Sequence, residues 1–170
     1  MKSAQGNVSS AKNLLSTAET ALSSINDLLN QIKSKVADAS DPTKNQSALA
    51  NDINALGDEI SAIFTNTKFN DTSLLSGSAA PSFSFKVGTS DSLSIALGST
   101  GGQDLSTFSA SGAVGGSLTG IDVSTVQTAV QDALGKAGNF QQRLDVKEEF
   151  LMSAISNAEA TVSRIFDADM

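Results

Sequence analysis

The sequence contains no cysteine, no histidine, no tryptophan and no tyrosine. Without cysteine and histidine the chain cannot form disulfides, thiolate–imidazole zinc sites, a catalytic thiol or a histidine-based triad. No apolar run approaches the roughly 20 residues that a membrane-spanning helix needs, so we expect no membrane partner. The N-terminus lacks the charged-then-apolar pattern of a secretory signal peptide. These absences favour a packing unit over an enzyme, and we expect no cofactor.

The net charge of the chain further limits the kinds of partner that we expect. The 170 residues include 18 acidic and 11 basic side chains, for a formal net charge of −7. An acidic chain is repelled by a phosphate backbone, so nucleic acid is not expected as a partner. Carboxylates that are adjacent in sequence, such as Asp58 and Glu59, point to different faces of a helix. They therefore predict solvated faces, with no catalytic and no metal site.

Two apolar seams, one near each end of the chain, dominate the pattern. Both advance in alternating steps of three and four residues, which places a stripe on a long helix that needs a partner helix. The first seam consists of Val8, Ala11, Leu15, Ala18, Leu22, Ile25, Leu29, Ile32 and Val36. The second consists of Val130, Leu134, Ala137, Leu144, Leu151, Ile155, Ala158, Val162 and Ile165. We expect the seams to pack together, with polar contacts at Gln141 and Glu148, which fill the two remaining positions of the second seam.

The N-terminal part predicts a helical hairpin. One helix over about 3–38 is followed by a second over about 43–65, for which Asp41 is the candidate N-cap. The apolar residues of the second helix also have heptad spacing: Leu49, Ile53, Leu56, Ile60 and Ile63. Because the link is short, the two helices should lie antiparallel.

The pattern changes after the second helix. Apolar and polar residues alternate over 83–87 and over 93–97, which predicts a β-hairpin with one buried face. A lone hairpin is marginally stable in water, so it should lie against the helices. Residues 98–120 are rich in glycine, serine and threonine, and Ser124 is the candidate N-cap of the last helix.

These elements predict a mainly α protein with a small β region. An N-terminal helical hairpin and a long C-terminal helix form an elongated antiparallel bundle or coiled coil, with the β-hairpin packed at one end. We expect one domain with three parts: the helical hairpin of the core (1–68), the β-hairpin with a Gly/Ser-rich surface segment (69–123), and the C-terminal core helix (124–170).

Five strings, in order along nearly the whole chain, resemble bacterial flagellin, the subunit of the flagellar filament. Residues 18–25 (AETALSSI) are similar to the family's TAEGAL-type helix, and residues 67–75 (TKFNDTSLL) to its T-x-F-N-G-x-x-L-L segment. Residues 85–88 (FKVG) stand where the family has F-Q-V-G. Residues 142–145 (QRLD) resemble Q-N-R-L-D/E, and residues 163–170 (SRIFDADM) resemble S-R-I-R-D-A-D-M.

The resemblance implies a structural subunit that self-assembles into an extracellular filament for swimming motility, exported without a cleaved signal peptide. The implied partners are other flagellin copies and, for the full-length form, an export chaperone and a cap protein. The hook–filament junction protein, which has the same helical plan, is one alternative. A cytosolic coiled-coil adaptor that binds through the β-hairpin is the other.

Three departures from the family pattern stand out. Asp71 replaces the usual glycine. The chain resembles a core fragment that lacks both terminal segments of the filament's inner tube. Only residues 98–120 occupy the place of the outer domains, and their candidate O-glycan acceptors are Ser106, Thr107, Ser109 and Ser111.

The resemblance also suggests contact residues. The innate Toll-like receptor for flagellin reads the family's R-x-R-E-L-A-V stretch and a glutamate on the next helix. Aligned by heptads, the key arginine becomes Gln31, the key leucine becomes Lys35, and the glutamate falls near Asp52. This implies weak receptor binding at most. Arg143 and Arg164, the only arginines, are candidates for ion pairs with the helical hairpin or an adjacent subunit, and exposed arginines are the alternative.

Overall fold

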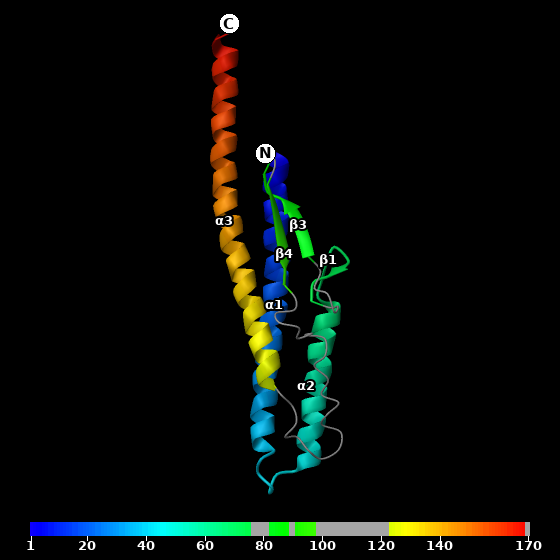
Figure 1. Ribbon diagram of the computed structural model, residues 1–170. Coiled ribbons are helices and arrows are strands. Elements are labelled where there is room, and N and C mark those ends of the chain that lie inside the picture. The colour runs from blue at the N-terminus through cyan, green and yellow to red at the C-terminus, as the bar shows by residue number, and fades with distance from the viewer. Residues whose placement is uncertain (76–81, 89–90, 98–122, 169–170) are drawn as a thin grey trace.

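The computed structural model describes residues 1–75, 82–88, 91–97 and 123–168. Its elements are α1 (Lys2–Asp38), α2 (Gln46–Asn66), β1 (Lys68–Phe69), β2 (Thr72–Ser73), β3 (Ser82–Lys86), β4 (Ser92–Ala96) and α3 (Val123–Ala168). The helices form an elongated rod in which α2 and α3 both run antiparallel to α1 (Figure 1). The predicted fold class, mainly helical with a small β region, is confirmed. The candidate glycan acceptors lie outside the described residues.

Helix α1 is the central element of the rod. It packs against α3 on one side, while α2 accompanies its C-terminal half and the β3–β4 hairpin lies beside its N-terminal half (Figure 1). Leu14 lies off the heptad seam and is nevertheless fully buried. Because α1 contacts three elements, its buried face is broader than the single stripe that the sequence predicts.

The connection between α1 and α2 differs from the prediction. Helix α2 begins at Gln46, and its N-cap is Asn45, whose Oδ1 accepts a hydrogen bond from the Ala48 N–H at 3.1 Å. The predicted cap, Asp41, is wrong. Its Oδ1 accepts instead from the backbone N–H and the hydroxyl of Thr43, at 2.9 and 2.7 Å. Aspartate readily bonds the backbone two residues ahead, so it stabilises a turn here.

The β3–β4 hairpin buries one face, as its alternation predicts. Phe83 pairs with Ile95 and Phe85 with Leu93 in an antiparallel register. The more deeply buried residues of this face are Val87, Leu93, Ile95 and Leu97. The Asn7 side-chain amide donates to the Lys86 carbonyl at 2.9 Å, which ties the hairpin to α1.

The start of α3 differs from the prediction by a short distance. The helix already includes Val123, which is buried, so Ser124 lies inside the helix and is not its N-cap. Val123 contributes an apolar side chain to the core.

The sequence analysis missed a second, smaller hairpin. Strands β1 and β2 pair antiparallel, and Asn70 and Asp71 connect them with φ angles of 49° and 60°. Two consecutive residues with positive φ are typical of a type I′ turn, which favours asparagine, aspartate and glycine. The adjacent Asn70 and Asp71 were the available signal.

Replacing Asp71 with glycine should stabilise the protein. A residue with a Cβ pays a steric penalty at a φ of 60° that glycine avoids. We expect Asp71→Gly to raise the free energy of unfolding by about 0.5–1 kcal/mol in urea titrations. Asp71→Ala should lower it, because alanine keeps the Cβ and loses the local hydrogen bonding of aspartate. Equal values for the two variants would contradict the assignment of strain to this residue.

Candidate assembly surface

The two heptad seams meet where α1 and α3 pack together. On α1, the predicted seam residues Leu15, Leu22, Ile25, Leu29 and Ile32 are fully buried. On α3, Leu144 is fully buried, Leu151 is nearly so, and Ile155 is half-buried. Val162, on the same stripe, is 52% exposed. The packed part of the second seam therefore fades near Ile155.

The side chains at alternate positions of the second seam differ in how deeply they are buried. Val130, Ala137, Leu144 and Leu151 are buried, whereas Leu134, Gln141, Glu148 and Ile155 are only half-buried. The half-buried row lies at the edge of the α1–α3 contact, where a polar side chain can reach a partner. This explains why the polar residues of the seam fall only in that row.

Both polar seam residues bond to α1. The Gln141 side chain donates to Glu19 Oε2 at 2.7 Å. Lys12 Nζ lies 2.5 Å from Glu148 Oε2 and 2.6 Å from Asp145 Oδ1, so one ammonium bridges two carboxylates of α3. The hydrogen bond to Asp145, which has the larger effect, and the hydrogen bond to Glu148 both raise the pKa of Lys12 above its usual value. These contacts fix the register of the two long helices.

A hollow opens where the hairpin tip meets α3. Its volume is about 450 Å³, and its lining includes Met1, Val87, Gly88, Asp91, Phe150 and Leu151. Phe150 is 67% exposed. Lys147 of α3 is ion-paired with Asp91 at the rim. The hollow is therefore lined mainly by apolar side chains, and the ion pair between Lys147 and Asp91 connects its two sides.

The Asp91–Lys147 pair should make stability depend on pH in acid. The hydrogen bond from Lys147 lowers the pKa of Asp91 below its ordinary 3.8. A depressed pKa contributes stability above the unfolded-state value, and this is lost as the pH falls through the folded-state value. Asp91→Asn should therefore be less stable than the parent at pH 7, with the difference shrinking below about pH 4.

Urea unfolding between pH 7 and 2.5 measures this difference. In a Lys147→Met background, Asp91→Asn should change the slope of the acid limb much less, because the main donor that lowers the pKa of Asp91 has been removed and only the smaller effects of Ser92 and Arg143 remain. An unchanged pH dependence of the Asp91→Asn effect in that background would assign the shift to another group.

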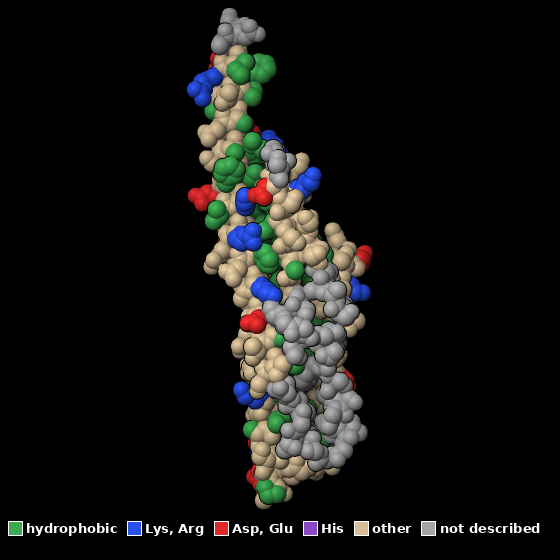
Figure 2. Space-filling model, viewed as in Figure 1, with side chains coloured by type: hydrophobic (Ala, Val, Ile, Leu, Met, Phe, Trp, Pro, Cys, Tyr) green, Lys and Arg blue, Asp and Glu red, His purple; other side chains and the backbone are tan. Residues whose placement is uncertain are grey.

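Helix α3 carries apolar side chains that the described residues leave exposed. Six exposed large apolar residues lie on this helix: Val146, Phe150, Met152, Val162, Ile165 and Phe166. Figure 2 shows hydrophobic side chains gathered along the upper half of the rod, where α3 runs beside and then beyond the N-terminus of α1. Where exposed apolar side chains form a contiguous patch, such a surface is typical of protein–protein contacts.

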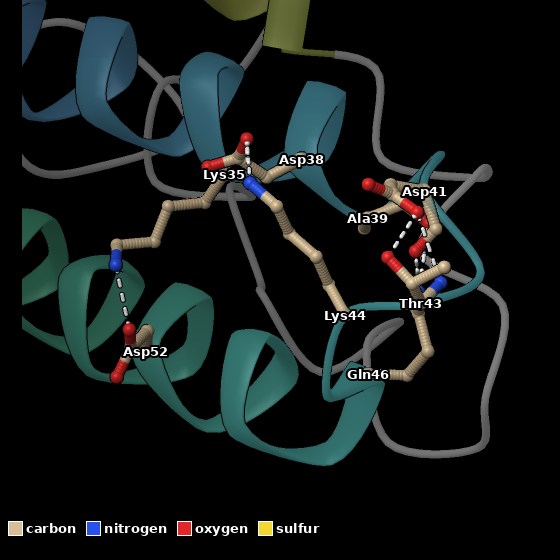
Figure 3. Close-up of polar contacts among 8 residues, drawn as sticks. All are labelled: Lys35, Asp38, Ala39, Asp41, Thr43, Lys44, Gln46 and Asp52. Atoms are coloured by element: carbon tan, nitrogen blue, oxygen red, sulfur yellow. Dashed lines mark hydrogen bonds and ion pairs between the residues drawn. The ribbon is translucent and has the colours of Figure 1, made fainter.

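Two of the three candidate receptor residues bond to each other. Lys35 Nζ of α1 lies 2.6 Å from Asp52 Oδ2 of α2, and both side chains remain partly exposed (Figure 3). Gln31 is exposed one helical turn before Lys35 and shares its face of α1. A second ion pair, between Lys44 and Asp38 at 2.6 Å, closes the connection between the two helices.

The side chains of the two arginines contact residues of their own helix, α3. The Arg143 guanidinium lies 5.7 Å from the centre of the Phe140 ring on the same helix. Arg164 Nε donates to the Ala160 carbonyl at 3.4 Å. Within the described ranges neither arginine forms an ion pair, although the charge of Arg143 contributes to lowering the pKa of Asp91.

Two further searches concern the described residues only. They contain no helix long and apolar enough to cross a membrane. They also contain no group of three or more acidic side chains arranged to hold a metal ion.

Comparison with known proteins gives one family match and two similar folds. Residues 1–80 match the family model for the bacterial flagellin N-terminal helical region. The fold is similar to that of Bacillus cereus flagellin, with 23% sequence identity, a TM-score of 0.71 and coverage of 92% of this chain and 94% of that one. It is also similar to a putative flagellar hook-associated protein from Vibrio parahaemolyticus, with 19% identity, a TM-score of 0.68 and coverage of 98% and 89%. No curated protein matches the chain.

Proposed function

We propose that this chain, flagellin-like in its N-terminal sequence and its fold, is a structural subunit of the bacterial flagellar filament. The observation that carries the proposal is the match of residues 1–80 to the flagellin N-terminal region, in a chain with a flagellin-like fold over 92% of its length. The match covers the helical hairpin, which contributes much of the rod's core.

The physical character of the surface supports the same role. A filament subunit works through its faces rather than through a pocket, and the exposed apolar residues of α3 offer such a face. The partners in this proposal are other copies of the subunit, with an export chaperone and a cap protein acting on the full-length form. The protein would leave the cell without a cleaved signal peptide and act outside it. Neither catalysis nor a cofactor is part of the role.

One observation favours a second candidate. The similarity to the putative hook-associated protein covers 98% of this chain, which supports a junction protein between hook and filament as the second candidate. The family match of the N-terminal region favours the filament subunit over the junction protein. A cytosolic adaptor is the third candidate and has no such match.

Electron microscopy of negatively stained cells separates these candidates. The full-length product would be expressed in a bacterium whose own flagellin gene has been deleted. Long filaments support the proposal, hooks that end in short caps support the junction protein, and bare hooks with the product retained in the cytoplasm support the adaptor.

A pair of variants tests whether α3 supplies the contact face. Phe150→Asp places a charge on an exposed apolar position, whereas Ser153→Asp places the same charge on an exposed polar position of the same helix. Both should change the free energy of unfolding by less than about 0.5 kcal/mol. Only Phe150→Asp should shorten the filaments. Equal filament lengths would remove Phe150 from the contact face.

A further inference from the structure

The connection between α1 and α2 contains an aspartate directly before a proline, at Asp41 and Pro42. Both residues are exposed, so water and solvent protons reach the peptide bond between them. This bond is a tertiary amide, and its proline nitrogen is a better leaving group, once protonated, than the nitrogen of an ordinary peptide bond. The carboxylate of Asp41 lies next to the carbonyl of the same bond. A nucleophile and its electrophile therefore belong to one residue.

The carbonyl oxygen of Asp41 accepts hydrogen bonds from two donors. The Lys44 backbone N–H donates to it at 3.2 Å, and Gln46 Nε2 donates to it at 3.1 Å. Gln46 Nε2 also donates to the Ala39 carbonyl at 3.0 Å, which fixes the direction of its amide group (Figure 3). Two donors on one carbonyl oxygen are the arrangement that stabilises the negative charge of a tetrahedral intermediate.

The carboxylate of Asp41 is oriented by Thr43. Its Oδ1 accepts both hydrogen bonds from Thr43, and within the described residues its Oδ2 accepts none. The hydroxyl of Thr43, then its backbone N–H, and then the charge of Lys44 lower the pKa of Asp41 below its ordinary 3.8. Lys44 is itself ion-paired with Asp38. The Asp41 carboxylate therefore stays ionised, and able to attack, at a lower pH than an ordinary aspartate.

We propose that the folded chain cleaves itself in mild acid between Asp41 and Pro42. Oδ2 of Asp41 bonds to the carbonyl carbon of the same residue, and Lys44 and Gln46 stabilise the oxyanion that forms. The bond from this carbon to the Pro42 nitrogen then breaks, and the nitrogen leaves with the electron pair and takes a proton from the solvent. Water opens the cyclic anhydride that remains on Asp41. The net reaction consumes one water molecule and yields residues 1–41 and 42–170.

The fold should survive this cleavage. Helix α1 packs against α2 and α3 through buried apolar residues that all precede the connection. Once the cleaved protein unfolds, however, its two pieces must meet again before they refold, so refolding becomes dependent on concentration. The cleavage thus makes unfolding in acid irreversible on dilution. The inference goes beyond the filament role and does not depend on it.

Incubation of the purified 170-residue chain at about pH 4, near the ordinary pKa of aspartate, tests the proposal. Mass spectrometry under denaturing conditions should find a product that begins at Pro42. The bond between Ala80 and Pro81, the other bond to a proline, is the internal control and should stay intact, because alanine has no carboxylate. The donors are aligned only in the folded chain, so cleavage should be at least about 5-fold slower in concentrated urea at the same pH. Cleavage that is equally fast in urea, or no product beginning at Pro42, would overturn the proposal.

Two variants test the two groups separately. Asp41→Glu keeps the charge but lengthens the side chain, so the less favourable ring closure should slow cleavage at least about 30-fold. Gln46→Met removes one donor to the oxyanion and should slow cleavage about 3–10-fold, less than in a water-excluded active site because the carbonyl is exposed. Gln142→Met, the same change at an exposed glutamine of α3, should leave the rate unchanged. Parent-like cleavage of Asp41→Glu, or equal rates for the two glutamine variants, would overturn the mechanism.

Discussion

Leu144→Ala should lower the free energy of unfolding by about 2–5 kcal/mol, among the largest effects of any single truncation in this chain. Leu144 is fully buried in the centre of the α1–α3 contact. Its truncation removes apolar contacts and leaves a cavity between two long helices, which relax only partly toward each other. A loss of this size is a large fraction of the 5–15 kcal/mol that stabilises a typical domain.

Val162→Ala is the matched control, because Val162 lies on the same stripe of the same helix but is half exposed. It should change the free energy of unfolding by less than about 0.5 kcal/mol, measured at a concentration where the chain is monomeric. Helix content followed by circular dichroism through a urea titration reports both variants. A loss of several kcal/mol at Val162 would mean that the packed seam reaches further than Ile155.

The difference in burial between Leu144 and Val162 shows the limit of what heptad spacing can predict. Spacing defines which side chains share a face of a helix, and both residues do share one. It does not define how deeply each residue of that face is covered, and Leu144 is fully buried whereas Val162 is 52% exposed. The depth of burial depends on which elements pack against each part of the face, and spacing along one helix does not contain that information.

Gln141 and Glu148 illustrate a second limit. Both are half-buried and bonded to α1, through Glu19 and Lys12. Their positions in the seam could be read from the sequence, but their partners could not, because a residue of α1 lies more than 100 positions away along the chain. Polar seam residues predict that a partner exists, and only the register of the packed helices identifies it.

Local turns were predicted less well than the long elements. Asp41 and Asn45 are both common N-cap residues, and the helix uses the second because Asp41 is already bonded to Thr43. The Asn70–Asp71 turn between β1 and β2 is recognisable by residue type but joins strands of only two residues each. Such short strands carry too little alternation to stand out from a loop.

The Lys35–Asp52 ion pair leads to the second large effect that we expect. By its resemblance to flagellin, this chain has Gln31 and Lys35 where the innate Toll-like receptor for flagellin engages an arginine and a leucine. The receptor would lose a charge-assisted donor and an apolar anchor, and it would have to separate Lys35 from Asp52 at 2.6 Å. Losses at such central contacts cost about 2 kcal/mol or more each. We propose that the full-length protein is at least about 100-fold less potent than a flagellin with both residues.

Reporter cells that carry the receptor measure this potency, and restoring the two residues tests its cause. Gln31→Arg combined with Lys35→Leu should raise potency by about 100-fold, because it supplies both missing contacts and releases the Asp52 carboxylate. The matched control combines Ser9→Arg with Asn13→Leu, which introduces the same two side chains at exposed positions of α1, also four residues apart but several turns away from Gln31 and Lys35. It should leave potency unchanged.

Because the Lys35–Asp52 pair is partly exposed, its loss should cost less than about 1 kcal/mol of stability, so altered potency would not reflect unfolding. Normal potency of the unmodified protein would show that recognition does not depend on these positions.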